Sequence, residues 1–206
     1  MAKMIDNKPS WKGEGKVWES LSANLPGDNV VYNQREVNGR EYDFCVMAEN
    51  LGLVIIEVKG WDPDKIDVRG VDNIIVDGYD EPQTSPKKQA RAYRFAILNK
   101  IVEKYNASPL VLDMVCYPFI TQEQYVRTKL DIVSEPEYTI FKEDIEDGKK
   151  LNEKIQHLFT LNKFIPHADF SYDLMVRIRK QLEPDFKLSV IDNKNKPYSK
   201  LSIFPN

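Results

Sequence analysis

Two strand-like segments joined by a tight turn, residues 41–47 and 53–59, carry side chains suited to metal-assisted chemistry. Because side chains alternate along a strand, Asp43, Glu57 and Lys59 share one face. A turn centred midway between the segments sets Asp43 opposite Glu57, with Cβ atoms about 5 Å apart, and two such acids repel each other unless a cation neutralises them. The other face is wholly apolar and consists of Tyr42, Phe44, Val46, Val54, Ile56 and Val58.

These residue types predict hydrolysis of a phosphodiester bond. The reaction needs an activated water and stabilised charge at phosphorus, which one or two divalent cations supply. Hard cations such as Mg²⁺ take oxygen ligands, so we expect the metal to bind Asp43, Glu57 and the backbone carbonyl of Val58. We expect the ammonium group of Lys59 to assist the attacking water and to offset charge developing at phosphorus.

Glu14 is a further acidic candidate, at the start of a predicted helix over residues 14–25. It belongs to a stripe of helical spacing that faces inward and continues through Val17, Trp18, Leu21 and Leu25. A carboxylate turned toward a core is costly unless it is paired or near a metal, so we expect Glu14 to assist the metal shell. The alternative is that Glu14 only stabilises the helix N-terminus, where negative charge is favourable.

A second predicted helix, residues 86–105, is the most basic stretch of the chain. Ser85 is suited to cap it and Pro86 to be its first residue. Its first turn combines free backbone donors with lysines, which favours phosphate, and Gln89 and Tyr93 lie one turn apart. We expect Gln89 to orient the phosphate, and we expect nucleic acid to contact Lys87, Lys88, Arg91, Tyr93 and Arg94. The alternative is a solvated charged face with Tyr93 in the core.

The order of the elements predicts an α/β fold. A strand over residues 29–37 and the strand pair described above form a three-stranded antiparallel meander after the first helix. The basic helix then crosses over to a buried strand within 110–120, which gives a mixed central sheet with helices on both faces. A strand pair near 65–69 and 73–77 either extends this sheet or caps the site.

The second half of the chain has weaker patterns. We assign residues 1–120 to the core and residues 121–206 to a mostly helical extension of it. We expect this extension to lead into a missing C-terminal module, and the alternative is a stand-alone protein. Helices are predicted over 147–161 and 171–182, and a strand-like segment lies within 185–206.

Composition narrows the function classes. The formal net charge of −3 argues against nucleic acid covering the whole surface but permits a local basic patch. No apolar run approaches the roughly 20 residues that cross a bilayer. Cys45 and Cys116 lie in apolar runs, and the N-terminal residues lack a signal-peptide pattern, so we expect a cytoplasmic protein. With two histidines and two cysteines, a zinc site is not expected.

Taken together, the motifs resemble the nuclease-related domain, NERD, of the PD-(D/E)xK nuclease superfamily. The resemblance covers about the first 120 residues and rests on the segments GEGKVWESL, EYDFCVM, GLVIIEVKGW and SPKKQARAY. The segment from Gln89 to Tyr93 also looks like the Q-x-x-x-Y element of exonuclease branches. Tyr42 stands where the superfamily name has proline.

The resemblance implies a restriction-endonuclease-like fold and a Mg²⁺- or Mn²⁺-dependent deoxyribonuclease. The catalytic residues implied in this sequence are Glu14, Asp43, Glu57, Lys59 and Gln89. Similar domains often precede a helicase, and some similar nuclease-helicase proteins act in antiviral defence. We therefore expect DNA as the partner, with a helicase module in the same polypeptide or complex. The alternative is a non-catalytic nucleic-acid-binding or protein-docking module on the same fold, and RNA stays open as a substrate.

Overall fold

The computed structural model describes residues 1–37 and 39–182. The chain divides into two compact units, residues 1–170 and residues 171–206. In the second unit, the described part is the helix α6 (Tyr172–Leu182), close to the predicted helix over 171–182. The strand-like segment predicted within 185–206 lies outside the described residues. No helix in the described part of the chain is long and apolar enough to cross a membrane.

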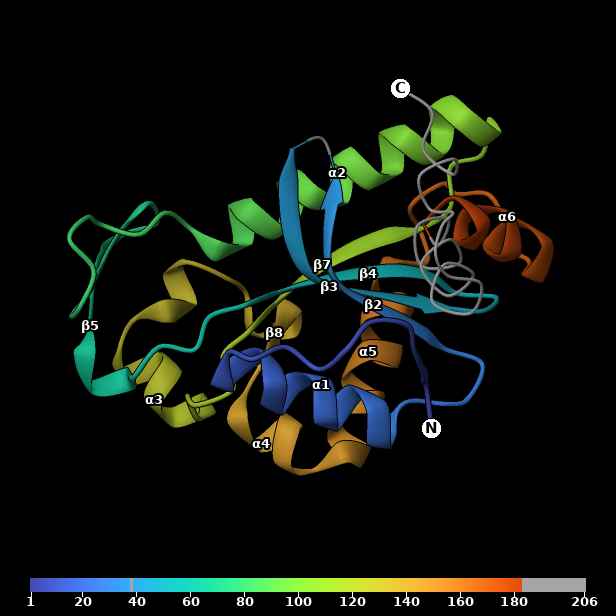
Figure 1. The fold of residues 1–206 in the computed structure, drawn as a ribbon. Helices are drawn as coiled ribbons and strands as arrows, with labels where there is room; N and C mark the ends of the chain where they lie inside the picture. Colours follow the sequence, from blue (N-terminus) through green and yellow to red (C-terminus); the bar gives the residue numbers. More distant parts are fainter. Residues whose placement is uncertain (38, 183–206) are drawn as a thin grey trace, which may run out of the picture. The chain divides into compact units, whose positions relative to one another are not determined.

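A six-stranded mixed sheet forms the centre of the first unit, in the order β1-β2-β3-β4-β7-β8 (Figure 1). Strands β2, β3 and β4 are antiparallel neighbours, whereas β7 lies parallel to β4. The predicted meander and the parallel strand after a crossover helix are therefore confirmed. The strands are β1 (Lys3–Met4), β2 (Val30–Val37), β3 (Arg40–Ala48), β4 (Gly52–Val58), β7 (Val111–Cys116) and β8 (Thr139–Ile140).

Helices cover both faces of this sheet, as an α/β fold of this kind requires (Figure 1). The helix α2 (Pro86–Tyr105) lies on one face. The other face carries α1 (Lys12–Asn24), α4 (Lys142–Glu146) and α5 (Gly148–Asn162). The main core fills the space under α1 and α5 and includes Val17, Leu21, Phe44, Val46, Val54, Ile56, Leu151 and Ile155.

The hairpin between β3 and β4 has the predicted register. Phe44 pairs with Ile56 and Ala48 pairs with Gly52, so the turn is centred on Asn50. Asn50 adopts a left-handed conformation with φ of 63°, which asparagine tolerates better than most residues. Every residue of β4 is buried because helices cover both faces of the sheet around it.

The basic helix α2 begins and ends as its sequence predicts. The hydroxyl oxygen of Ser85 accepts a hydrogen bond of 3.3 Å from the backbone N–H of Lys88, and Pro86 is the first helical residue. Asn106 ends the helix in a left-handed conformation, and its N–H donates to the carbonyl of Val102 at 2.9 Å.

The predicted second strand pair forms a separate two-stranded sheet of β5 (Ile66–Gly70) and β6 (Asn73–Val76). The first alternative, an extension of the central sheet, is therefore wrong. The pair instead packs its apolar side chains into a second, smaller core that also contains Trp61, Tyr117, Tyr125 and Phe141. The remaining helix α3 (Gln122–Arg127) borders this core. The segment after β4 is thus anchored and not a loose loop.

Candidate active site

The ends of β3 and β4 bring two carboxylates together. Continuing the observed strand register by one residue beyond Phe44 and Ile56 sets Asp43 opposite Glu57. A carboxylate oxygen of Asp43 accepts a hydrogen bond of 2.6 Å from the backbone N–H of Val58. Glu57 itself is buried, with 5% of its surface exposed. The two acids are therefore held on neighbouring strands, as the turn geometry predicts.

Lys59 follows directly after β4 and lies beside these acids. Its backbone N–H donates to the carbonyl of Cys116 at 2.9 Å, which continues the pairing of β4 with β7. Its ammonium nitrogen lies 2.7 Å from a carboxylate oxygen of Glu57. This position puts one positive charge within the acidic cluster.

Glu14 lies in the first turn of α1 and is half-buried. Its carboxylate accepts a hydrogen bond of 3.0 Å from the side-chain amide of Gln34 on β2. Gln34 has a φ of 52°, a left-handed conformation that is rare for a residue other than glycine within a strand. The sequence does not predict the contact of Gln34 with Glu14, because the alternating strand pattern around Gln34 does not indicate a left-handed residue.

A close approach between two glycines brings α1 to the end of β4. A Cβ atom on Gly13 would lie 3.2 Å from the Cα atom of Gly60 and 3.4 Å from Cγ of Pro118. The absence of a side chain at Gly13 therefore lets the start of α1, and with it Glu14, lie against the segment after Lys59.

The acids influence one another electrostatically. The pKa of Asp43 is raised to about 7, first by burial and then by the negative charge of Glu57, while the hydrogen bond from Val58 opposes the rise. Burial likewise raises the pKa of Glu14, and the negative charges of Glu41 and Glu57 add to the effect. Perturbed acids that cluster in this way are typical of functional sites.

The oxygen donors at this position fit a hard divalent cation. Asp43 and Glu57 are neighbouring carboxylates. Burial raises the pKa of Asp43 first, and the negative charge of Glu57, which a cation would neutralise, raises it further. Within residues 1–37 and 39–182, however, no group of three or more His, Cys, Asp or Glu side chains is arranged to hold a metal. The pair, with the Val58 carbonyl as a predicted third ligand, is therefore the candidate, and Glu14 contributes to the surrounding charge.

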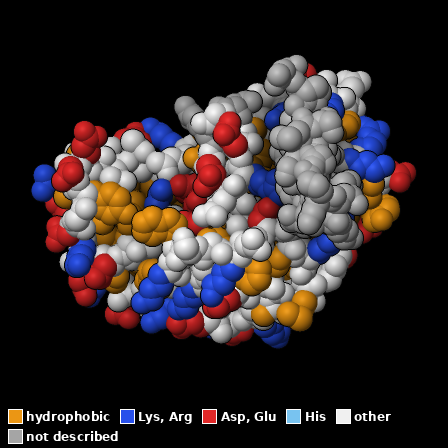
Figure 2. Space-filling model, viewed as in Figure 1, with side chains coloured by type: hydrophobic (Ala, Val, Ile, Leu, Met, Phe, Trp, Pro, Cys, Tyr) orange, Lys and Arg blue, Asp and Glu red, His pale blue; other side chains and the backbone are white. Residues whose placement is uncertain are grey.

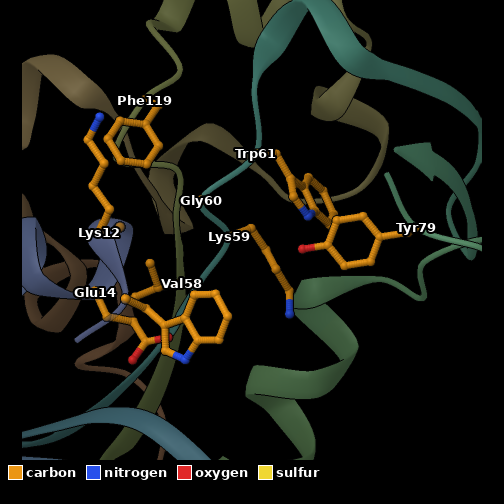
Figure 3. A pocket seen from close by; sticks show the side chains of 10 residues that line it. Lys12, Glu14, Val58, Lys59, Gly60, Trp61, Tyr79 and Phe119 are labelled. Carbon is orange, nitrogen blue, oxygen red and sulfur yellow. The ribbon is translucent and has the colours of Figure 1, made fainter. Parts of the chain in front are cut away.

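A pocket of about 450 Å³ opens beside the acids (Figure 3). Glu14 and Lys59 line it, together with residues from the start of α1, the end of β4, the segment after β6 and the segment after β7. Sequence reasoning missed most of these lining residues, which are Trp11, Lys12, Gly13, Gly60, Trp61, Tyr79 and Phe119.

Gln89 makes a local contact and does not bond to the acids. Its side-chain amide donates to the hydroxyl of Thr84 at 2.8 Å, across the start of α2. Its role in orienting phosphate stays a prediction.

Most of the basic residues predicted to bind nucleic acid have acidic partners within the protein. Lys87 is buried, and its ammonium nitrogen lies 3.0 Å from a carboxylate oxygen of Asp113. Arg94 contacts the same Asp113 at 3.1 Å, and Lys88 pairs with Asp72. Arg91 is exposed and Tyr93 is half-buried. Of these residues, Lys88 and Arg91 are the ones that α2 exposes to solvent, and the contact with nucleic acid stays a prediction.

Comparison with protein families identifies the region around the site. The family model NERD, the nuclease-related domain, matches residues 9–118. Comparisons with curated proteins and with solved structures gave no match. The matched range runs from just before α1 to just after β7, and it includes all four residues that form the acidic cluster and its lysine, which are Glu14, Asp43, Glu57 and Lys59.

Proposed function

The chain belongs to the nuclease-related domain family, and from this premise we propose that it is a Mg²⁺-dependent deoxyribonuclease that hydrolyses phosphodiester bonds. The observation that carries the proposal is the cluster of Asp43, Glu57 and Lys59, of which Lys59 lines the pocket. A buried acid with a pKa raised to about 7 beside a second carboxylate and a lysine suits phosphoryl chemistry better than it suits stability.

Each residue has a distinct part in the proposed reaction. A bound divalent cation would supply Lewis-acid stabilisation and lower the pKa of the attacking water. Asp43 and Glu57 would hold it, and the backbone N–H of Val58 donates a hydrogen bond to one carboxylate oxygen of Asp43. The ammonium of Lys59, 2.7 Å from Glu57, is positioned to donate a hydrogen bond to the water or to a phosphate oxygen.

Plasmid nicking tests the proposal. The purified chain should convert supercoiled plasmid to nicked and linear forms with Mg²⁺ or Mn²⁺, and a chelator should stop the reaction. Asp43→Asn keeps an acceptor for Val58 but removes the charge, and Lys59→Ala removes the ammonium group. We expect each to lower the rate at least roughly 100-fold, as removal of a single electrostatic group does in other enzymes.

Two exposed residues provide matched controls. Asp67 and Lys88 each form an ion pair at the surface, with Arg69 and Asp72 respectively. Asp67→Asn and Lys88→Ala should cleave plasmid at the wild-type rate. Wild-type rates in both Asp43→Asn and Lys59→Ala would overturn the assignment. Calorimetry adds an independent readout, because a docking module has no reason to bind Mg²⁺ through Asp43.

A further inference from the structure

Four aromatic side chains surround the pocket beside the acids: Trp11, Trp61, Tyr79 and Phe119. Figure 3 shows Trp61 and Tyr79 on one side of the pocket and Phe119, with Lys12 and Glu14, on the other. Trp11 is 72% exposed and Tyr79 is 55% exposed, whereas Trp61 is buried. The pocket therefore offers aromatic faces to solvent directly next to the acids.

Folding alone does not account for the exposed pair. Trp11 occupies the N-cap position of α1, where it makes no side-chain cap, although Ser, Thr, Asp or Asn would stabilise the helix better. A tryptophan exposed in this way adds little burial to the core. Single exposed aromatics are common, but two around one pocket suggest a ligand with a flat apolar face.

Tyr79 is presented by an anchored segment. Its backbone N–H donates to the carbonyl of Val76 at 3.1 Å, and Gly78 supplies the left-handed turn with φ of 95°. The preceding strand pair is fixed by Ile74 and Val76, which pack in the same core as Trp61. Hydrophobic side chains gather on the surface between this pair and the central sheet (Figure 2).

The same pocket holds a cation that lacks an acidic partner. The ammonium nitrogen of Lys12 lies 5.7 Å from the ring centroid of Phe119, and no carboxylate within residues 1–37 and 39–182 forms an ion pair with it. Lys16 lies 5.8 Å from the same ring, but it also pairs with Glu146. An adjoining hollow along α1 is lined by Lys8, Lys12, Lys16, Glu19 and Phe119 among others, and Lys8 pairs with Glu19 there.

We propose that this pocket binds an unpaired nucleobase of the strand being cleaved, stacked on Trp11 and Tyr79, with a flanking phosphate on Lys12. Stacking on aromatic side chains tolerates every base, whereas a base within a duplex must first leave its stack. The inference rests on the proposed function, which supplies DNA as the strand that is bound and cleaved. It predicts that the enzyme cleaves single strands, frayed ends and the unpaired segments that supercoiling opens in a plasmid in preference to fully paired duplex.

Binding by an inactive variant tests the pocket without cleavage. In Asp43→Asn protein, fluorescence anisotropy of a labelled DNA single strand should show tighter binding than that of a blunt duplex of the same sequence. Adding Trp11→Ala or Tyr79→Ala should weaken single-strand binding roughly fivefold or more, which is the scale of one lost base–aromatic stack. Trp11→Phe should keep most of the affinity, and duplex binding should not change.

Phe164 provides the matched control, because it is an aromatic residue that is 82% exposed and does not line the pocket. Phe164→Ala should bind both DNA forms as the parent does. Equal affinity for single strand and duplex, unchanged by Trp11→Ala and Tyr79→Ala, would overturn the inference even if plasmid is cleaved. Single-strand binding that depends on Trp11 in a protein that cleaves nothing supports the pocket and overturns the proposed hydrolysis. Tighter binding of an RNA strand supports the pocket and overturns DNA as the substrate.

Discussion

The carboxylate of Asp43 accepts a hydrogen bond of 2.6 Å from the backbone N–H of Val58, so the acid on β3 is tied to the strand that carries Glu57 and Lys59. The backbone pairing of β3 with β4 ends at Phe44 and Ile56, and this bond to the side chain of Asp43 links the two strands just beyond that point. It stabilises the charged form of Asp43, but burial and the charge of Glu57 outweigh it. The site thus holds more negative charge than it can readily stabilise.

The first prediction concerns the pH dependence of stability without metal. The pKa of Asp43 is about 7 in the folded protein against 3.8 for an ordinary aspartate. At a pH between these two pKa values, Asp43 keeps its proton in the folded protein but releases it in the unfolded chain. The free energy of unfolding should therefore fall as pH rises from about 4 to about 7. Thermal unfolding in chelator should show this fall, and Asp43→Asn should reduce it.

The exposed Asp67→Asn variant is the control and should follow the wild-type pH dependence. Adding Mg²⁺ above pH 7 should raise the unfolding temperature of wild type, because binding to the folded state stabilises it. If Asp43→Asn shows the same fall with pH as wild type, the raised pKa belongs to another group.

Local patterns in the sequence accounted for the parts of the fold that depend on neighbouring residues. Alternation and a central turn predicted the β3–β4 register, and the pair Ser85-Pro86 predicted the start of α2. The edge strands β1 and β8 were not predicted, because two residues are too few to form a pattern. The strand pair β5–β6 was predicted, but its separation from the central sheet depends on packing against distant residues such as Tyr117.

The same distinction applies to the site. Asp43, Glu57 and Lys59 lie on one hairpin, so their proximity follows from a local register. Lys87 illustrates the limit of such reasoning. Its position in the first turn of α2 favours phosphate binding, but the tertiary fold brings Asp113 on β7 next to it, and the two form an ion pair. The aromatic lining of the pocket was likewise missed, since residues such as Tyr79 follow no periodic pattern and come from segments far apart in sequence.

The second prediction concerns the contact between α1 and the end of β4. Gly13→Ala would place a Cβ atom 3.2 Å from the backbone of Gly60, so the start of α1 should shift away by a few tenths of an ångström. Because Glu14 is the next residue, we expect the cleavage rate to fall roughly tenfold while the fold persists, since small misplacements of site residues have large effects on rate. Plasmid cleavage and circular dichroism would measure the two effects.

Gly27→Ala is the matched control for this substitution. The nearest atom to its added Cβ would be a backbone oxygen of Met1 at 3.6 Å, an ordinary contact distance. It should leave cleavage unchanged. A Gly13→Ala protein with the wild-type cleavage rate would show that the glycine contact does not position Glu14.

The third prediction distinguishes buried from exposed lysines at the start of α2. Lys87→Ala should lower the free energy of unfolding by about 3 kcal/mol, because among the residues that the structure describes it leaves buried Asp113 with Arg94 as its one ionic partner. Lys88→Ala removes an exposed ion pair with Asp72 and should cost at most about 1 kcal/mol. Urea unfolding of the two variants would measure the difference. Similar values for both would contradict the structural role assigned to Lys87.

The last prediction compares Lys12 with the basic helix as the site of phosphate contact. The ammonium of Lys12 lies in the pocket without an acidic partner among the described residues, whereas Lys88 pairs with Asp72. In Asp43→Asn protein, Lys12→Ala should weaken single-strand binding and reduce the slope of log affinity against log salt by roughly 0.7, the value for one phosphate contact on a single strand. Lys88→Ala should leave the slope unchanged. A lower slope for Lys88→Ala and an unchanged slope for Lys12→Ala would place the strand along α2, as the sequence alone predicts, and away from the aromatic pocket.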